Sequence, residues 1–296
     1  MASEKQGQII NNNSKELRCS VERSWDTIDV PLRPESSNNG DTVKSQNILK
    51  KYLAIYRFHS AYGVREGISR VWSIFRELDL YDLRRGINTR TIKVVALEKS
   101  TYMPYWPAFS SVVSEMIKFS HNYYISAIRY SDLDRKAIFV DFGAGLGKTP
   151  LMAAETGKFS VSGGIEIDSE LVDVSKVNLQ RMTCKISGTG TFFSLGNVEK
   201  ARDISNLVTE IESFGINTFE STIFIFNKNS YGPDVLRNSL NLIEKYFDSI
   251  IYLYQNPIHH YVLADMGYIE FGNDSKLSTE HKNYKYRLFL KHNYKA

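Results

Sequence analysis

Three glycines at alternate positions lie between two acidic residues in the middle of the chain, and this group has the composition of a nucleotide-binding site. Gly143, Gly145 and Gly147 follow closely after Asp141, and Glu166 comes nineteen residues after the third glycine. Glycine lets the backbone approach a ligand closely and adopt positive φ. A carboxylate at the end of a strand, as expected for Glu166, can accept hydrogen bonds from the two hydroxyl groups of a ribose. We therefore expect this stretch to bind a ligand that contains a nucleoside.

The elements that must position these residues are predicted to be a strand, a loop, a helix and a second strand. The apolar run Ile138–Val140 leads into the first acid, and a second apolar run, Val161–Ile165, leads into Glu166. Between them, Pro150 suits the first turn of a helix, where its missing N–H costs nothing. Gly157 can supply a left-handed cap at the end of that helix. The order predicts a βαβ unit whose helix N-terminus points at the ligand.

Three ligand patterns compete for the glycine loop. A dinucleotide fingerprint, G-x-G-x-x-G, needs a third glycine where this chain has Lys148. A phosphate-binding P-loop, G-x-x-x-x-G-K-[ST], fits Gly147, Lys148 and Thr149 but needs its first glycine at Phe142. The third pattern, D-x-G-x-G-x-G, matches completely from Asp141 onward. A glycine-rich turn without any ligand is disfavoured, because three glycines weaken a fold unless something is gained.

The matching pattern resembles a motif of a known family. The stretch FVDFGAGLGK, residues 139–148, resembles the first motif of the class I S-adenosylmethionine-dependent methyltransferases, and Glu166 resembles their ribose-binding acid. The resemblance implies a methyltransferase with S-adenosyl-L-methionine as its cofactor. It assigns the loop and Asp141 to the amino-acid part of the cofactor and a later loop to its adenine. The cofactor-binding residues implied in this way are Tyr102, Asp141, Gly143, Ala144, Gly145, Gly147, Glu166, Ile167, Asn197 and Val198.

A second stretch resembles the part of these enzymes that meets the methyl acceptor. The loop NKNSYGPDV, residues 227–235, aligns without a gap to N-N-F-A-F-G-P-E-V of the non-SET histone lysine methyltransferases. The segment IIYLYQNPIHHYVL, residues 250–263, instead resembles a set of uncharacterised bacterial methyltransferases, which have proline where this chain has Lys228. The likeness implies catalytic roles for Asn227 and Tyr231.

The acceptor favoured by these likenesses is a protein side-chain amine, a lysine, with a nucleic acid or a small molecule as alternatives. Adenine-N6 methyltransferases carry two prolines in this loop, and the sequence Asn227-Lys228-Asn229-Ser230 has neither. A P-loop nucleotide hydrolase and a non-catalytic S-adenosylmethionine-binding protein remain open as other functions. The sequence does not give the oligomeric state.

The periodicity of the remaining chain predicts an α/β protein with a Rossmann-like seven-stranded sheet, mostly parallel with an antiparallel last strand. We expect a flexible tail over residues 1–46, a helical N-terminal cover over 47–134, and the cofactor-binding domain over 135–296. Right-handed crossovers place the carboxyl ends of parallel strands on one edge of the sheet. The polar residues expected to line that edge are Asp141, Glu166, Asn197, Asn227 and Gln255.

The composition is that of an ordinary globular protein. Of 296 residues, 42% are hydrophobic and 24% charged, and the net charge is +4. Two cysteines are too few for a disulfide framework, and no apolar run approaches the ~18 residues of a membrane span. The N-terminus has no apolar signal region, so we expect a cytoplasmic protein. No spacing of His, Cys, Asp or Glu predicts a metal site.

Overall fold

The structure is a computed structural model of the chain. It describes Leu53, Tyr56, Arg57 and residues 63–90, 107–128, 135–182, 186, 188–228, 231–272 and 286–292. The predicted tail and Tyr102 lie outside the described residues. Residues 48–92 and 96–296 belong to one compact unit, and the site described below lies within it.

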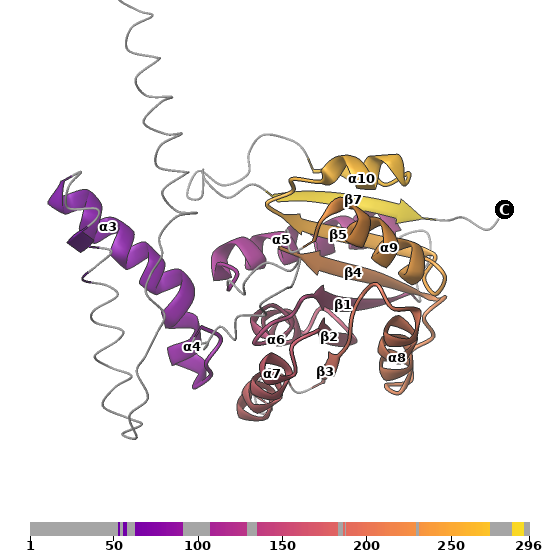
Figure 1. The fold of residues 1–296 in the computed structure, drawn as a ribbon, viewed down its shortest axis with the longest axis horizontal. Coiled ribbons are helices and arrows are strands. Elements are labelled where there is room, and N and C mark those ends of the chain that lie inside the picture. The colour runs from indigo at the N-terminus through magenta and orange to yellow at the C-terminus, as the bar shows by residue number, and fades with distance from the viewer. Residues whose placement is uncertain are drawn as a thin grey trace, which may run out of the picture. The chain divides into compact units, whose positions relative to one another are not determined.

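Seven strands form one sheet in the order β3-β2-β1-β4-β5-β7-β6 (Figure 1). The first five in this order are parallel, whereas β7 runs antiparallel to both of its neighbours. The predicted Rossmann-like sheet, with its antiparallel last strand, is confirmed. The strands are β1 (Lys136–Phe142), β2 (Val161–Glu166), β3 (Gly190–Leu195), β4 (Ser221–Asn227), β5 (Ser249–Gln255), β6 (Ile269–Phe271) and β7 (Tyr286–His292).

Helices connect the parallel strands and cover both faces of the sheet (Figure 1). The helix after β1 begins behind a left-handed Gly147, and the chain turns at Gly157 with φ 63°, both as predicted. The helices are α3 (Val64–Ile74), α4 (Leu80–Arg85), α5 (Ser110–Tyr123), α6 (Lys148–Glu155), α7 (Ser169–Met182), α8 (Ala201–Glu212), α9 (Pro233–Ile243) and α10 (His260–Asp265), with π-helical turns at Phe75–Asp79 and Tyr124–Ile128.

Each face of the sheet buries its own apolar core, because successive side chains of a strand point to opposite faces. On one face, Phe139 of β1 packs with residues of α5, α6 and α7. On the other face, Val140 packs with residues of α8, α9 and α10. Asp141 follows in this alternation, so its side chain is on the same face as Phe139. Helices α5, α6 and α7 therefore cover the face that carries Asp141, and α8, α9 and α10 cover the opposite face.

Candidate functional site

The glycine loop between β1 and α6 folds back onto the end of β2. Gly143, Gly145 and Gly147 all have positive φ, at 85°, 54° and 83°. The N–H groups of Gly143 and Ala144 both donate to the carbonyl oxygen of Ile165, at 2.9 and 3.1 Å. The N–H of Gly147 donates to the carbonyl of Ala144 at 2.9 Å. The protein itself thus uses N–H groups that a phosphate-binding loop would present to its ligand.

Glu166 completes the loop from the tip of the neighbouring strand. Its Oε2 accepts a hydrogen bond from the N–H of Gly145 at 2.8 Å. Its Oε1 accepts from the N–H groups of Ile167 and Asp168, at 2.8 and 3.1 Å. Burial raises the pKa of this carboxyl, and the three N–H donors oppose that effect. A carboxylate offers about four acceptor sites, so Glu166 keeps capacity for a ligand hydroxyl.

Two adjacent glycines inside β2 allow this close packing. A Cβ on Gly164 would lie 2.3 Å from the Cβ of Ala144 in the loop, and a Cβ on Gly163 would lie 2.3 Å from the ring of Phe192. The two positions face opposite sides of the strand. Gly164 is therefore required for the approach of the glycine loop to β2. A glycine pair inside an apolar strand is the sequence feature that indicates such a close approach.

Asp141 lies at the end of β1, and its side chain is almost completely buried. The hydroxyl of Thr149 donates a hydrogen bond to its carboxylate. Burial raises the pKa of the Asp141 carboxyl well above its usual range, and the nearby charge of Glu166 raises it further. Thr149 and the ammonium group of Lys228 oppose that rise. Two carboxyl groups with raised pKa values therefore lie on neighbouring strand tips, where a cationic ligand would stabilise their ionised forms.

Two lysines border the site from different elements, and the charge of one of them, Lys228, opposes the rise in the pKa of Asp141. Lys148, the first residue of α6, is buried, and its Nζ donates to the carbonyl oxygen of Glu77 at 2.9 Å. Lys228, directly after β4, donates from its Nζ to the carbonyl of Pro107 at 3.1 Å. In a P-loop the corresponding lysine reaches the ligand phosphates and the next hydroxyl binds magnesium. Here the Nζ of Lys148 instead bonds to the main-chain carbonyl of Glu77, and the Thr149 hydroxyl bonds to the Asp141 carboxylate.

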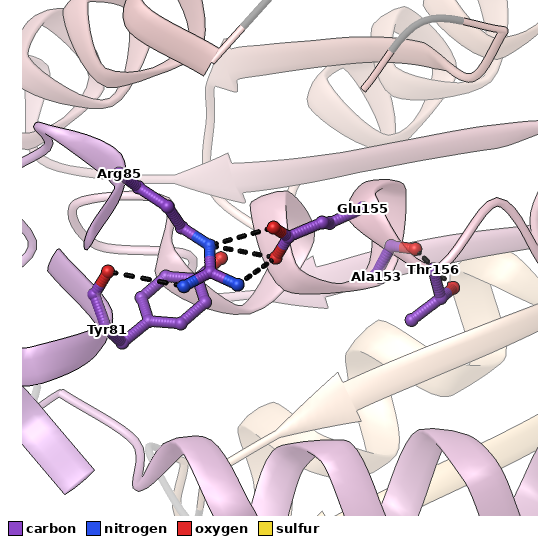
Figure 2. Close-up of polar contacts among 5 residues, drawn as sticks. All are labelled: Tyr81, Arg85, Ala153, Glu155 and Thr156. Atoms are coloured by element: carbon purple, nitrogen blue, oxygen red, sulfur yellow. Dashed lines mark hydrogen bonds and ion pairs between the residues drawn. The ribbon is translucent and has the colours of Figure 1, made fainter. Parts of the chain in front are cut away.

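The N-terminal helices attach to α6 through a charged pair as well as through Lys148. Arg85 of α4 donates from Nε to both carboxylate oxygens of Glu155, at 2.9 Å each, and its Nη2 lies 2.6 Å from Oε2 (Figure 2). The Arg85 guanidinium lies 3.8 Å from the centre of the Tyr81 ring. These residues line a cleft of about 430 Å³ between α4, α5 and α6. The contacts fix the helical segment against the helix that follows the glycine loop.

The other predicted cofactor residues, Ile167, Val198 and Asn197, differ in how exposed their side chains are and in what they bond to. Ile167 is 39% exposed beside Glu166, so its side chain is available to pack on an adenine ring. Val198 is buried in the core that faces α8. Asn197 accepts the N–H of Glu199 at 2.9 Å through Oδ1. Its amide oxygen therefore shapes its own turn, and the predicted adenine contacts of Asn197 and Val198 stay predictions.

The two predicted catalytic residues lie at and after the end of β4. Asn227 is buried at the end of β4, and Tyr231 packs partly buried against the core on the α8–α10 side. The parallel register pairs Asn227 with Tyr254 of β5. Because β1, β2, β4 and β5 are parallel, Asp141, Glu166, Asn227 and Gln255 at their carboxyl ends lie along one edge of the sheet, and Asn197 follows two residues after β3 ends.

Within the described part of the chain, no group of three or more His, Cys, Asp or Glu residues is placed to hold a metal ion. In that same part, every helix is too short or too polar to span a membrane.

No family model matches the chain. No curated protein matches it in sequence. Solved structures that resemble it include magnesium protoporphyrin IX methyltransferase from Synechocystis PCC 6803 with bound SAM, at 10% identity over 75% of this chain and 94% of that one, with a TM-score of 0.39. A Leishmania major SAM-dependent methyltransferase is 11% identical over 61% of this chain and 73% of its own, at TM-score 0.41. TrmK from M. capricolum, in complex with S-adenosyl-homocysteine, is 13% identical over 62% and 67% of the two chains, at TM-score 0.38. Because these TM-scores lie below 0.5, we base the function on the site's own residues.

Proposed function

We propose that this chain is an S-adenosylmethionine-dependent methyltransferase. The observation that carries the proposal is the closed bonding of the glycine loop. Its N–H groups at Gly143, Ala144 and Gly145 bond to Ile165 and Glu166, so the site presents carboxylates where a phosphate site presents N–H donors. S-adenosylmethionine carries a cationic sulfonium and an ammonium group but no phosphate, and such a ligand suits this edge of the sheet.

The arrangement supports a definite placement of the cofactor. Glu166 would accept a hydrogen bond from a ribose hydroxyl, with Ile167 against the adenine and the amino-acid part over the loop near Asp141. The sulfonium would then lie toward the tip of β4, where Asn227 and Tyr231 would meet the acceptor. Methyl transfer from a sulfonium is an in-line displacement at an activated carbon, so holding the reactants in line supplies much of the catalysis.

The acceptor that we propose is a protein side-chain amine, on the basis of the loop resemblance at residues 227–235. A nucleic acid or a small molecule is the second choice. A P-loop hydrolase is disfavoured, because Lys148 is bonded to the Glu77 carbonyl and Thr149 to Asp141.

The proposal is tested by transfer of a labelled methyl group from S-adenosylmethionine into fractions of a cell lysate. The native chain should label a protein fraction, and Glu166→Gln should label it far less. The control Glu170→Gln changes an exposed acid at the start of α7 and should label normally. Equal labelling by Glu166→Gln would refute the ribose assignment. Cofactor binding without any transfer would show the chain to be a non-catalytic binding protein.

A further inference from the structure

Lys228 is placed where the acceptor should approach the cofactor. It is the first residue after β4, it is partly buried, and its Nζ bonds to the carbonyl of Pro107 just before α5. Neighbouring strands lie about 4.8 Å apart, so the tips of β2 and β4 are separated by about 10 Å, with β1 between them. A cofactor with its ribose on Glu166 and its amino-acid part over the loop therefore brings its sulfonium near Lys228. This step rests on the proposed function.

A buried amide beside Lys228 independently indicates a ligand at this place. Gln255 ends β5 with its side chain fully buried, and among the described residues neither its Oε1 nor its Nε2 has a hydrogen-bond partner. The register pairs Asn227 with Tyr254, and Lys228 and Gln255 are the residues that follow this pair on the two strands. Leaving a buried amide unpaired costs folding free energy. A polar group of a bound ligand would remove that cost.

Burial is the main influence on the protonation of Lys228. Burial lowers the pKa of its amine to about 7, and repulsion by Lys148 of α6 lowers it in the same direction. Asp141 of β1 opposes this effect. An amine with this pKa is about half neutral at pH 7 and can accept a proton, whereas an ordinary surface lysine is almost fully protonated there.

We propose that Lys228 is the catalytic base of this site and takes the proton from the acceptor amine. An acceptor ammonium transfers one proton to the neutral Nζ of Lys228. The resulting amine forms a bond to the methyl carbon, the bond from carbon to sulfur breaks, and its electron pair stays on sulfur. The products are a methylated ammonium, S-adenosylhomocysteine and the Lys228 ammonium, which returns its proton to water.

This placement has a consequence that can be measured without an identified acceptor. A protonated Lys228 repels the sulfonium of S-adenosylmethionine but not the neutral sulfur of S-adenosylhomocysteine. With a pKa of about 7, the neutral fraction rises about tenfold between pH 6 and pH 8. If only that form accepts the sulfonium, the ratio Kd(S-adenosylmethionine)/Kd(S-adenosylhomocysteine) should fall by up to about tenfold over this range. The α-amino group is common to both ligands, so its titration cancels in the ratio.

The experiment is calorimetric titration of the full chain with each ligand at pH 6, 7 and 8. The native chain should show the falling ratio. Lys228→Met keeps the length of the side chain and should give a ratio that does not change with pH. Lys228→Arg stays charged and should give a high ratio at every pH. The control Lys176→Met, at an exposed position on α7, should behave like the native chain, and thermal melting confirms that each variant folds.

Several outcomes would overturn the proposal. A ratio independent of pH in the native chain would place Lys228 away from the sulfonium. A dependence that survives in Lys228→Met would assign the titration to Asp141. A methyl group found on Lys228 by mass spectrometry would make it an acceptor rather than the base. Binding of neither ligand would instead refute the proposed function itself.

Discussion

The glycine pair in β2 gives a sharp test of how the strand positions the loop. In Gly164→Ala the new Cβ would lie 2.3 Å from the Cβ of Ala144 and 3.3 Å from Cγ of Pro150. Carbon atoms rest about 3.5–4.0 Å apart, so the glycine loop must move by more than about 1 Å. That movement strains the bonds from Gly143 and Ala144 to the Ile165 carbonyl.

Two quantities should change in Gly164→Ala. Overpacking costs about 1–3 kcal/mol, which for a domain of this size lowers Tm by about 2–12 °C. A displacement of about 1 Å in a positioning element can slow the reaction that it positions by about 100-fold, and we expect the displaced loop also to weaken the binding of S-adenosylhomocysteine. Differential scanning calorimetry and calorimetric titration measure the two effects.

The matched control is the neighbouring substitution Gly163→Ala. Its Cβ would lie 2.3 Å from the Phe192 ring, which belongs to the core on the opposite face of the sheet. Gly163→Ala should lower Tm by a similar amount and leave cofactor affinity nearly unchanged. Native affinity in Gly164→Ala, or an equal loss of affinity in both variants, would refute the reasoning that Gly164 acts through the loop.

Three further predictions concern charged groups. Glu166→Gln should weaken binding of S-adenosylhomocysteine by about 10–100-fold in titrations, since hydrogen bonds to a charged acceptor contribute about 1.5–3 kcal/mol each; native affinity would contradict the ribose role. Burial raises the pKa of Asp141 in the folded state, so its contribution to stability is present below pH ~4 and is lost as pH rises. Asp141→Asn should therefore melt above the native chain at pH 7 but not at pH 4, with weaker cofactor binding; a lower Tm at pH 7 would contradict this. Arg85→Met should cost about 1–3 kcal/mol of unfolding free energy, because it leaves Glu155 without the guanidinium that lies 2.6 Å away. A double-mutant cycle with Glu155→Gln should show coupling between the two residues. Strictly additive effects on stability would contradict this pairing.

The sheet and the acid at its rim could be predicted because their signals are local. Alternating glycines after Asp141 and an acid at the end of the next apolar run define the βαβ unit, and the structure bonds Gly145 to Glu166 directly. The mostly parallel sheet with its antiparallel last strand followed from the alternation of strands and helices, whereas the order of the strands comes from the structure.

The parts that could not be predicted depend on contacts between distant segments. Lys148 bonds to the carbonyl of Glu77, which comes 71 residues earlier in the chain, and no local pattern specifies that pairing. The sequence showed Lys228 only as a departure from the proline of a related loop. Its role follows from burial beside Lys148 and Asp141. Asn197 shows why a local pattern can also mislead. A polar residue after a strand can bond within its own turn, as Asn197 does with the N–H of Glu199, instead of binding a ligand.

Calorimetric titration of the native chain with S-adenosylhomocysteine tests the central claim most directly. Saturable binding of one molecule per chain, with no heat from ATP and magnesium, is the expected result. Saturable binding of ATP with magnesium, or no heat from S-adenosylhomocysteine or S-adenosylmethionine, would contradict the claim that these strand tips form a methyl-donor site.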